Sequence, residues 1–211
     1  MSSYPTIDIQ TTYPMINDQL DLPIYTDRLI IRALQSSDLL AYHSLLTDKG
    51  AMRNEPLSPD LSYTENVFPT PPGEAAEDDL WLGIFLKEPN NREGNLIGDG
   101  GVYYLLLSTE WPNLSYRIKE QYWNRGYATE FVRAFMRFWW RIPRHRQLKN
   151  LTIHPATLNA QDSPDQEVRE RVYISVTHGN SANQKVLTKA GFEKFEGMGE
   201  GTTHWRQIRE N

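Results

Sequence analysis

The 211-residue sequence contains no cysteine. Disulfide bonds, thiolate catalysis and cysteine-ligated metals are therefore excluded. No two of the five histidines are spaced as metal ligands usually are, so we predict no metal site. No apolar run is long enough to cross a bilayer, and the N-terminal residues lack the basic and apolar regions of a signal peptide. We therefore expect no membrane partner and a cytoplasmic location, with the nucleus as the alternative.

An excess of basic residues is missing too. The chain has 22 Lys and Arg against 27 Asp and Glu, a net charge of −5, which argues against binding to nucleic acid. Its hydrophobic content of 39% is typical of a globular protein, and its length is sufficient for a sizeable core. We expect a single domain over residues 27–211, acting as a monomer or a homodimer.

The pattern of apolar residues predicts an α/β fold with a mixed sheet. Helices are expected after Ser36 or Ser37, from Ala128, and after Ser181. The expected strands are 28–34, 80–87, 96–107, 113–118, 171–177 and 203–208. Because a helix joins the strands at 113–118 and 171–177, we expect these two to be parallel neighbours.

Three segments carry weaker patterns. Residues 1–26 are polar and contain three prolines, so we expect an extended N-terminal arm. Residues 54–79 are rich in proline and acids, and are predicted to be a long loop with room for one helical turn. Residues 141–169 have mixed charge and read as an insertion, with a short strand at 148–153.

The stretch from Tyr122 to Trp140 joins a polar turn to an apolar helix. Apolar side chains at 128, 131, 132, 135 and 139 share one helical face, which implies that Trp139 and Trp140 cannot both face inward. Gly126 and the small Ala128 leave the first amides of this helix accessible, as a phosphate site requires. The alternative is an ordinary turn, with Asn124 as a helix cap.

The helix after Ser181 has clear end signals. Ser181 and Gln184 match a capping box, and Gly191 followed by Phe192 matches a Schellman stop. Both this helix and the one from Ala128 follow a strand, so their N-termini are expected at the sheet edge where α/β proteins bind ligands.

These two segments, "LSYRIKEQYWNRGYATE" and "YISVTHGNSANQKVLTKAGFE", resemble the GNAT superfamily of acyl-CoA N-acetyltransferases. The resemblance is closest to the branch of the ribosomal-protein N-terminal alanine acetyltransferases. It covers about residues 28–208, with 141–169 unmatched. The family's loop pattern Q/R-x-x-G-x-G/A falls on residues 123–128, where Trp123 departs from Q/R. The resemblance implies a mostly antiparallel sheet with a splayed central parallel pair, flanked by helices.

The resemblance further implies that acetyl-CoA is the cosubstrate and that a primary amine, of a small molecule or a protein N-terminus, is the acceptor. The main chain of Tyr116, Arg117 and Ile118 would bind pantetheine, with an amide near Tyr116 directed at the thioester carbonyl. Asn180 would lie beside the acceptor or the pantetheine arm. The remaining residues implied to bind the cosubstrate are Trp123, Asn124, Arg125, Gly126, Tyr127, Ala128, Thr129 and Asn183.

Several residues are candidates for the proton-transfer groups. Many relatives place a tyrosine acid where this chain has Leu187, which leaves Tyr116, Tyr173, Ser181 or a water as the donor. Glu110 is the first candidate base and Glu55 the second, although each could be an ordinary surface carboxylate. His154 and His178 are the histidines expected nearest the site. An α-amine, with a pKa of about 8, needs a base less than lysine does. The alternative function is an acyl-CoA-binding domain with little or no turnover.

Overall fold

The computed structural model describes residues 5–53, 55–58, 60–74, 79–104, 109–196, 198 and 201–210. The chain divides into two compact units. The first unit comprises Ile16–Gly101 and Ser115–Phe138, and the second comprises Met1–Met15, Val102–Leu114 and Trp139–Asn211. Within the described residues, no helix is both long and apolar enough to cross a membrane.

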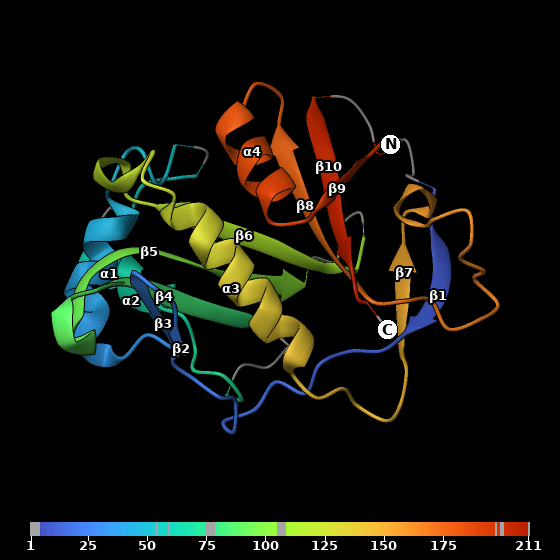
Figure 1. The fold of residues 1–211 in the computed structure, drawn as a ribbon, viewed down its shortest axis with the longest axis horizontal. Helices are drawn as coiled ribbons and strands as arrows, with labels where there is room; N and C mark the ends of the chain where they lie inside the picture. The colour runs from blue at the N-terminus through green and yellow to red at the C-terminus, as the bar shows by residue number, and fades with distance from the viewer. Residues whose placement is uncertain are drawn as a thin grey trace. The chain divides into compact units, whose positions relative to one another are not determined.

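Eight strands form a mixed sheet with the order β2-β3-β4-β5-β6-β8-β10-β9 (Figure 1). The parallel pair is β6 with β8, in a register that places Asn113 opposite Tyr173. The strands are β2 (Ile24–Tyr25), β3 (Leu29–Arg32), β4 (Leu80–Lys87), β5 (Glu93–Tyr104), β6 (Pro112–Ile118), β8 (Arg171–Thr177), β9 (Glu193–Phe195) and β10 (Thr202–Ile208). The predicted mixed α/β fold and its parallel pair are confirmed.

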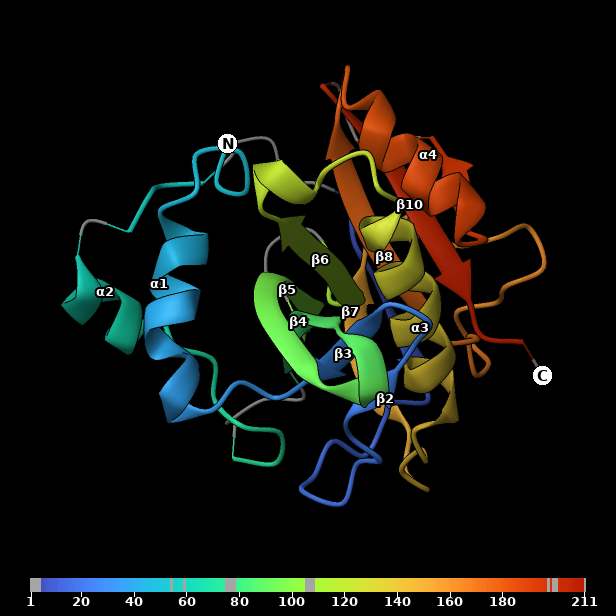
Figure 2. The same cartoon turned by 60° about the vertical axis from the view of Figure 1, so that its left-hand side comes forward.

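In the first unit, helices cover both sides of the strands. Helices α1 (Leu39–Leu46) and α2 (Leu61–Asn66) lie on one side and α3 (Tyr127–Arg141) on the other (Figure 2). Buried residues of β3, α1, β4, β5 and the segments that follow β3 and α1 form a core under α1: Ile30, Leu34, Tyr42, Leu45, Leu46, Met52, Phe85 and Leu96. Helix α2 is the single helical element expected in the 54–79 loop; positions 54, 59 and 75–78 of that loop lie outside the described residues.

Helix α3 buries the apolar face that its periodicity predicts. Phe131, Val132 and Phe135 have no exposed surface, and Trp139 is likewise buried whereas Trp140 is only partly so. Helix α3 packs closely on strand β5 at Gly100. A Cβ added there would lie 2.8 Å from the Phe131 ring, so a larger residue would push the helix away. The end of the predicted 96–107 strand, residues 105–107, lies outside the described residues.

In the second unit, β10 pairs antiparallel with both β8 and β9, and α4 (Ser181–Lys189) lies beside β8 and β10. The predicted Schellman stop is confirmed, because the Phe192 amide donates to the Leu187 carbonyl at 3.0 Å and Gly191 has φ +83°. The predicted capping box at Ser181 and Gln184 is wrong. Asn180 is the N-cap, because its side-chain oxygen accepts from the Asn183 amide at 3.2 Å.

The N-terminal arm is more ordered than expected. Strand β1 (Ile7–Thr11) pairs antiparallel with β7 (Lys149–Ile153) of the insertion, with Ile9 opposite Leu151. Together they cover a second core, which consists of Ile9, Trp111, Leu151, Ile153, Val168, Tyr173, Phe195 and Met198. The part of the arm up to Met15 and the insertion therefore belong to the same unit, joined by this strand pair.

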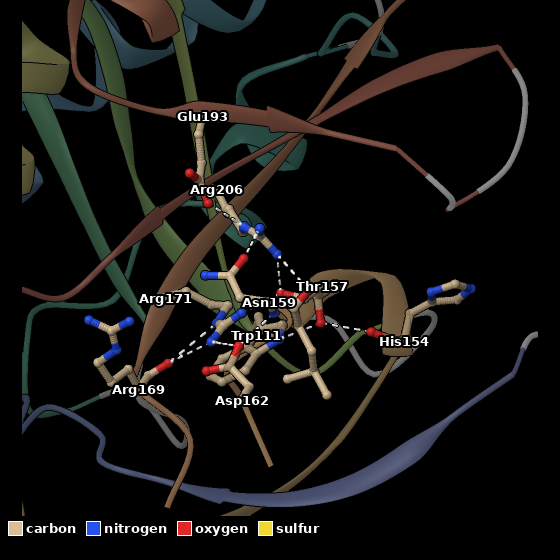
Figure 3. Close-up of polar contacts among 10 residues, drawn as sticks. Trp111, His154, Thr157, Asn159, Asp162, Arg169, Arg171, Glu193 and Arg206 are labelled. Carbon is tan, nitrogen blue, oxygen red and sulfur yellow. Dashed lines mark hydrogen bonds and ion pairs between the residues drawn. The ribbon is translucent and has the colours of Figure 1, made fainter. Parts of the chain in front are cut away.

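Two arginines connect the insertion to strands β8 and β10 by hydrogen bonds and an ion pair (Figure 3). Arg171 of β8 donates to the Thr157 carbonyl and forms a 2.9 Å ion pair with Asp162. Arg206 of β10 donates to the same carbonyl at 2.6 Å and pairs with Glu193 at 2.7 Å. Because Arg171 and Arg206 are buried, these bonds fix the 157–162 segment against β8 and β10.

Candidate active site

The loop before α3 adopts a conformation that few residue types tolerate. Asn124 has φ +59° and Gly126 has φ +83°, so two left-handed residues flank Arg125. The Glu130 amide donates to the Gly126 carbonyl at 3.0 Å, which makes Gly126 the N-cap of α3. The amides of Tyr127, Ala128 and Thr129 lie within the first turn of α3, before this first helical bond. The helix itself therefore offers them no carbonyl as a hydrogen-bond acceptor.

The backbone of this loop is accessible. Asn124, Arg125 and Gly126 are exposed, and a Cβ added at Gly126 would approach only the Arg28 guanidinium, at 3.3 Å. A helix N-terminus carries a partial positive charge, and its first amides are donors for an anion. The loop thus meets the requirements of a phosphate-binding turn in both charge and space.

Trp123 fixes the loop to strand β6. Its indole nitrogen donates to the Ile118 carbonyl at 2.7 Å, and the Arg53 guanidinium stacks 5.3 Å from its ring. Although Trp123 departs from the Q/R of the family pattern, it still provides a side-chain N–H donor. The Ile118 carbonyl is engaged in this bond.

The side chains of β6 alternate between two environments in the first unit. The Tyr116 ring lies 6.1 Å from the Phe131 ring, and burial raises the pKa of its hydroxyl. Arg117 points the other way and donates to both oxygens of Asp99, at 2.7 and 2.9 Å. Its side chain is held in this ion pair, so any contribution of Arg117 to cosubstrate binding would come from its main chain, as the resemblance implies.

Both candidate bases already accept a hydrogen bond. Glu55 pairs with Arg117 at 2.8 Å and keeps 53% of its side chain exposed. Glu110, in the second unit, accepts from the Thr152 amide at 2.6 Å and is partly exposed. Each carboxylate retains further lone pairs, so neither bond prevents it from accepting a proton from a water or an amine.

The turn before α4 holds the predicted residues of the second unit. Gly179 has φ +86°, and a Cβ added there would meet nothing within 4 Å. Asn180 holds the turn through its bond to the Asn183 amide at 3.2 Å. His178 is exposed, whereas His154 is buried and caps the 155–157 turn through its Nδ1. Of the two histidines, only His178 is accessible.

The candidate proton donors differ in burial. Leu187 is fully buried in place of the tyrosine found in many relatives, and Ser181 is exposed. The Tyr173 hydroxyl lies 2.6 Å from Nδ1 of His204, and burial raises its pKa to about 12. Sequence reasoning named Tyr173 but missed His204, because no local pattern links a strand residue to one 31 positions later. Among the described residues, no group of His, Asp and Glu could hold a metal.

The predicted residues thus fall into two sets. The first unit brings together Tyr116–Ile118 with Trp123–Thr129, and the second unit brings together Asn180 with Asn183. Glu110 belongs to the second unit, where it contacts β7.

Comparison with known proteins identifies the family. The profile described as "Acetyltransferase (GNAT) domain" matches residues 28–193, which is most of the chain. The chain belongs to the GNAT acetyltransferase family. It is therefore an acyltransferase, of the class that uses acetyl-CoA to acetylate amines. A search of curated proteins finds no match by sequence.

Solved structures share the GNAT fold at low identity. An acetyltransferase (GNAT family) from Bacillus anthracis has 16% identity and a TM-score of 0.60, over 90% of this chain and 100% of that one. The ribosomal L7/L12 alpha-N-protein acetyltransferase RimL, in complex with coenzyme A, has 14% identity and a TM-score of 0.59, over 89% and 98%. Spermidine N-acetyltransferase from Vibrio cholerae, in complex with CoA and spermine, has 14% identity and a TM-score of 0.55, over 87% of this chain and 97% of that one.

Proposed function

We propose that this GNAT protein transfers an acetyl group from acetyl-CoA directly to a primary amine of a small molecule or of a protein N-terminus. The observation that carries the proposal is the exposed, left-handed Asn124–Gly126 turn at the N-terminus of α3. RimL and the spermidine acetyltransferase have the same fold and are acetyltransferases of a protein N-terminus and of a polyamine.

The cosubstrate would bind through the loop of the first unit. Its pyrophosphate suits the amides of Arg125 to Thr129, with the α3 dipole adding attraction. The main chain of Tyr116, Arg117 and Ile118 is the proposed seat of pantetheine, and Asn183 is a further proposed contact. A main-chain donor at Tyr116 would stabilise the oxygen of the thioester carbonyl as it gains charge.

The acceptor nitrogen must be neutral when it attacks the thioester carbon. As the new C–N bond forms and the C–S bond breaks, one proton leaves the nitrogen and the thiolate gains one. Glu110 is the proposed proton acceptor, and Asn180 is proposed to position the acceptor. An α-amine is favoured over a lysine side chain, because its pKa of about 8 leaves more of it neutral near pH 7.

Initial-rate kinetics with acetyl-CoA and a panel of amines tests this function. Without cysteine to hold an acetyl group, direct transfer is expected to give intersecting double-reciprocal lines rather than parallel ones. We expect peptide N-termini or other amines of modest pKa to be acetylated faster than lysine side chains. A preference for lysine would contradict the acceptor class, and parallel lines would contradict direct transfer.

A second candidate function is cosubstrate binding without efficient turnover. The observation in its favour is the fully buried Leu187 at the position of the acid in many relatives. Thiol release that stays at the background rate with every amine, in a protein that binds CoA, would establish this alternative.

Replacing Glu110 with Gln should lower kcat by about 10- to 100-fold. A general base typically contributes about 100-fold or more, so this is a modest expected loss. The loss should be greatest at low pH, where most of the amine is protonated, while CoA affinity stays unchanged. Glutamine keeps an oxygen that can accept from the Thr152 amide, so the local structure should persist. Glu167→Gln, an exposed carboxylate of the same unit, is the matched control. Equal kcat across the pH range would remove Glu110 from the mechanism.

A further inference from the structure

Arg28, the residue before β3, contacts both the loop before α3 and the first turn of α3. Its Nη1 donates to the Arg125 carbonyl at 2.9 Å, and its Nε donates to the Glu130 carboxylate at 2.7 Å. The guanidinium also stacks 4.7 Å from the Tyr127 ring. One side chain thus contacts the loop, the first residue of the helix and the first turn of the helix.

The bond to Arg125 fixes the orientation of a peptide group. The Arg125 carbonyl and the Gly126 amide belong to one planar trans peptide, so they point in opposite directions. When Arg28 holds the carbonyl on its own side, the amide is directed away from Arg28. This peptide lies next to two residues with positive φ, Asn124 and Gly126, where a backbone without such a bond could rotate to other conformations.

The contact with Glu130 is electrostatic. Glu130 places a carboxylate in the first turn of α3, where it would repel an anion bound at the same helix N-terminus. Burial by itself would raise the pKa of Glu130. Hydrogen bonds from the Thr26 hydroxyl at 2.6 Å, the Arg28 amide at 2.9 Å and the Arg28 guanidinium outweigh burial and lower it, so the carboxylate stays charged. The positive charge of Arg28 neutralises it.

We infer that Arg28 is a positioning residue for the cosubstrate: it orients the Arg125–Gly126 peptide toward the pyrophosphate and cancels the charge of Glu130 beside it. This inference rests on the proposed function, because it concerns the same loop. Arg28 acts through the loop and the carboxylate, and takes no part in the transfer of the acetyl group.

The test compares the CoA dissociation constant of five variants by titration calorimetry. Arg28→Ala should weaken CoA binding about tenfold or more, since it frees the peptide and removes the cation that neutralises the Glu130 carboxylate. Glu130→Gln alone should bind CoA as well as the unmodified protein does. Arg28→Ala combined with Glu130→Gln should recover part of the loss. Arg28→Lys should be intermediate, because one ammonium cannot reproduce the fork that spans both partners. Arg92→Ala, which removes an exposed ion pair with Glu88, is the control and should leave CoA binding unchanged.

A second comparison separates positioning from a general loss of structure. S-acetylpantetheine carries the thioester without the pyrophosphate, so its kcat/KM should be the same in Arg28→Ala as in the unmodified protein, whereas that of acetyl-CoA should fall. An equal fall for both substrates, no rescue by Glu130→Gln, or an unchanged CoA dissociation constant would each overturn the inference. If Arg28→Ala does not fold, Arg28→Lys serves in the same comparisons. Failure of the unmodified protein to bind CoA would refute the proposed function itself, and with it this inference.

Discussion

With CoA at about 100 times its dissociation constant, the unmodified protein should melt about 5–10 °C higher than without it, and the Gly126→Val protein should show no such shift. Binding at that ligand excess stabilises the native state by about 2.7 kcal/mol, and each kcal/mol raises the melting temperature of a chain this long by about 2–4 °C. Differential scanning fluorimetry measures both proteins under identical conditions.

The variant should lose the shift because of its backbone rather than its bulk. Gly126 has φ +83°, and a β-branched residue there is strained by about 1–3 kcal/mol. The turn can relieve that strain by rotating its exposed peptides, which removes the arrangement of amides at the start of α3. Because a Cβ at this position meets only the Arg28 guanidinium, the rest of the fold should survive.

Gly191→Val is the matched control. Gly191 has the same φ of +83°, and its added Cβ would lie 3.4 Å from the Gln207 side chain, at the far end of α4 from the Asn180 turn. This variant should lose a similar amount of stability but keep the full CoA shift. A CoA shift that persists in Gly126→Val, or one that is absent from the unmodified protein, would show that the loop before α3 does not bind the cosubstrate.

Local patterns predicted most of the sheet and helices of this protein. The strands at 80–87 and 171–177 were predicted with the residues that the structure assigns to β4 and β8, because each apolar run is bounded by polar or turn residues. Helix α3 was predictable because its period places Phe131, Phe135 and Trp139 on one face. The family motifs locate the loop of residues 123–128 from the sequence alone.

Interactions between distant segments were not predictable in the same way. The arm reads as irregular because its strand β1 has no local partner, and pairs instead with β7 about 140 residues later. The same limit hid Arg28, whose partners Arg125 and Glu130 lie about 100 positions along the chain. The predicted N-cap of α4 is wrong for a different reason. Asn180 and Ser181 are adjacent residues that both favour N-caps, and only the backbone conformation decides between them.

Replacing Arg171 with Met should lower the free energy of unfolding by about 3–5 kcal/mol, as is typical when one partner of a buried ion pair is removed. Methionine is unbranched, like the stem of arginine, but it is shorter and cannot donate hydrogen bonds. The Asp162 side chain, which is only 7% exposed, would lose its ion pair with Arg171, and the Thr157 carbonyl would lose one donor but keep Arg206 (Figure 3). Chemical denaturation at pH 7 measures the loss, and Arg169→Met, an exposed arginine two residues earlier, should change stability little.

The pH dependence of this loss identifies its cause. Burial alone would raise the pKa of Asp162, but the Asn159 amide and the Arg171 guanidinium outweigh burial and lower it. In the unmodified protein, the ionised carboxylate therefore adds stability above its unfolded pKa of about 3.9, and this stability is lost as pH falls through the lower folded pKa. Without Arg171, burial dominates and the ionised carboxylate becomes a penalty. The difference in stability between the two proteins should therefore be largest at neutral pH and shrink below about pH 4, where Asp162 is protonated in the variant.

Adding Asp162→Asn to Arg171→Met should restore part of the stability at pH 7, because the asparagine is uncharged and can still accept from the Asn159 amide. A loss that is constant with pH and is not reduced by Asp162→Asn would mean that Arg171 stabilises the insertion through the Thr157 carbonyl and packing on Trp111, rather than through its charge.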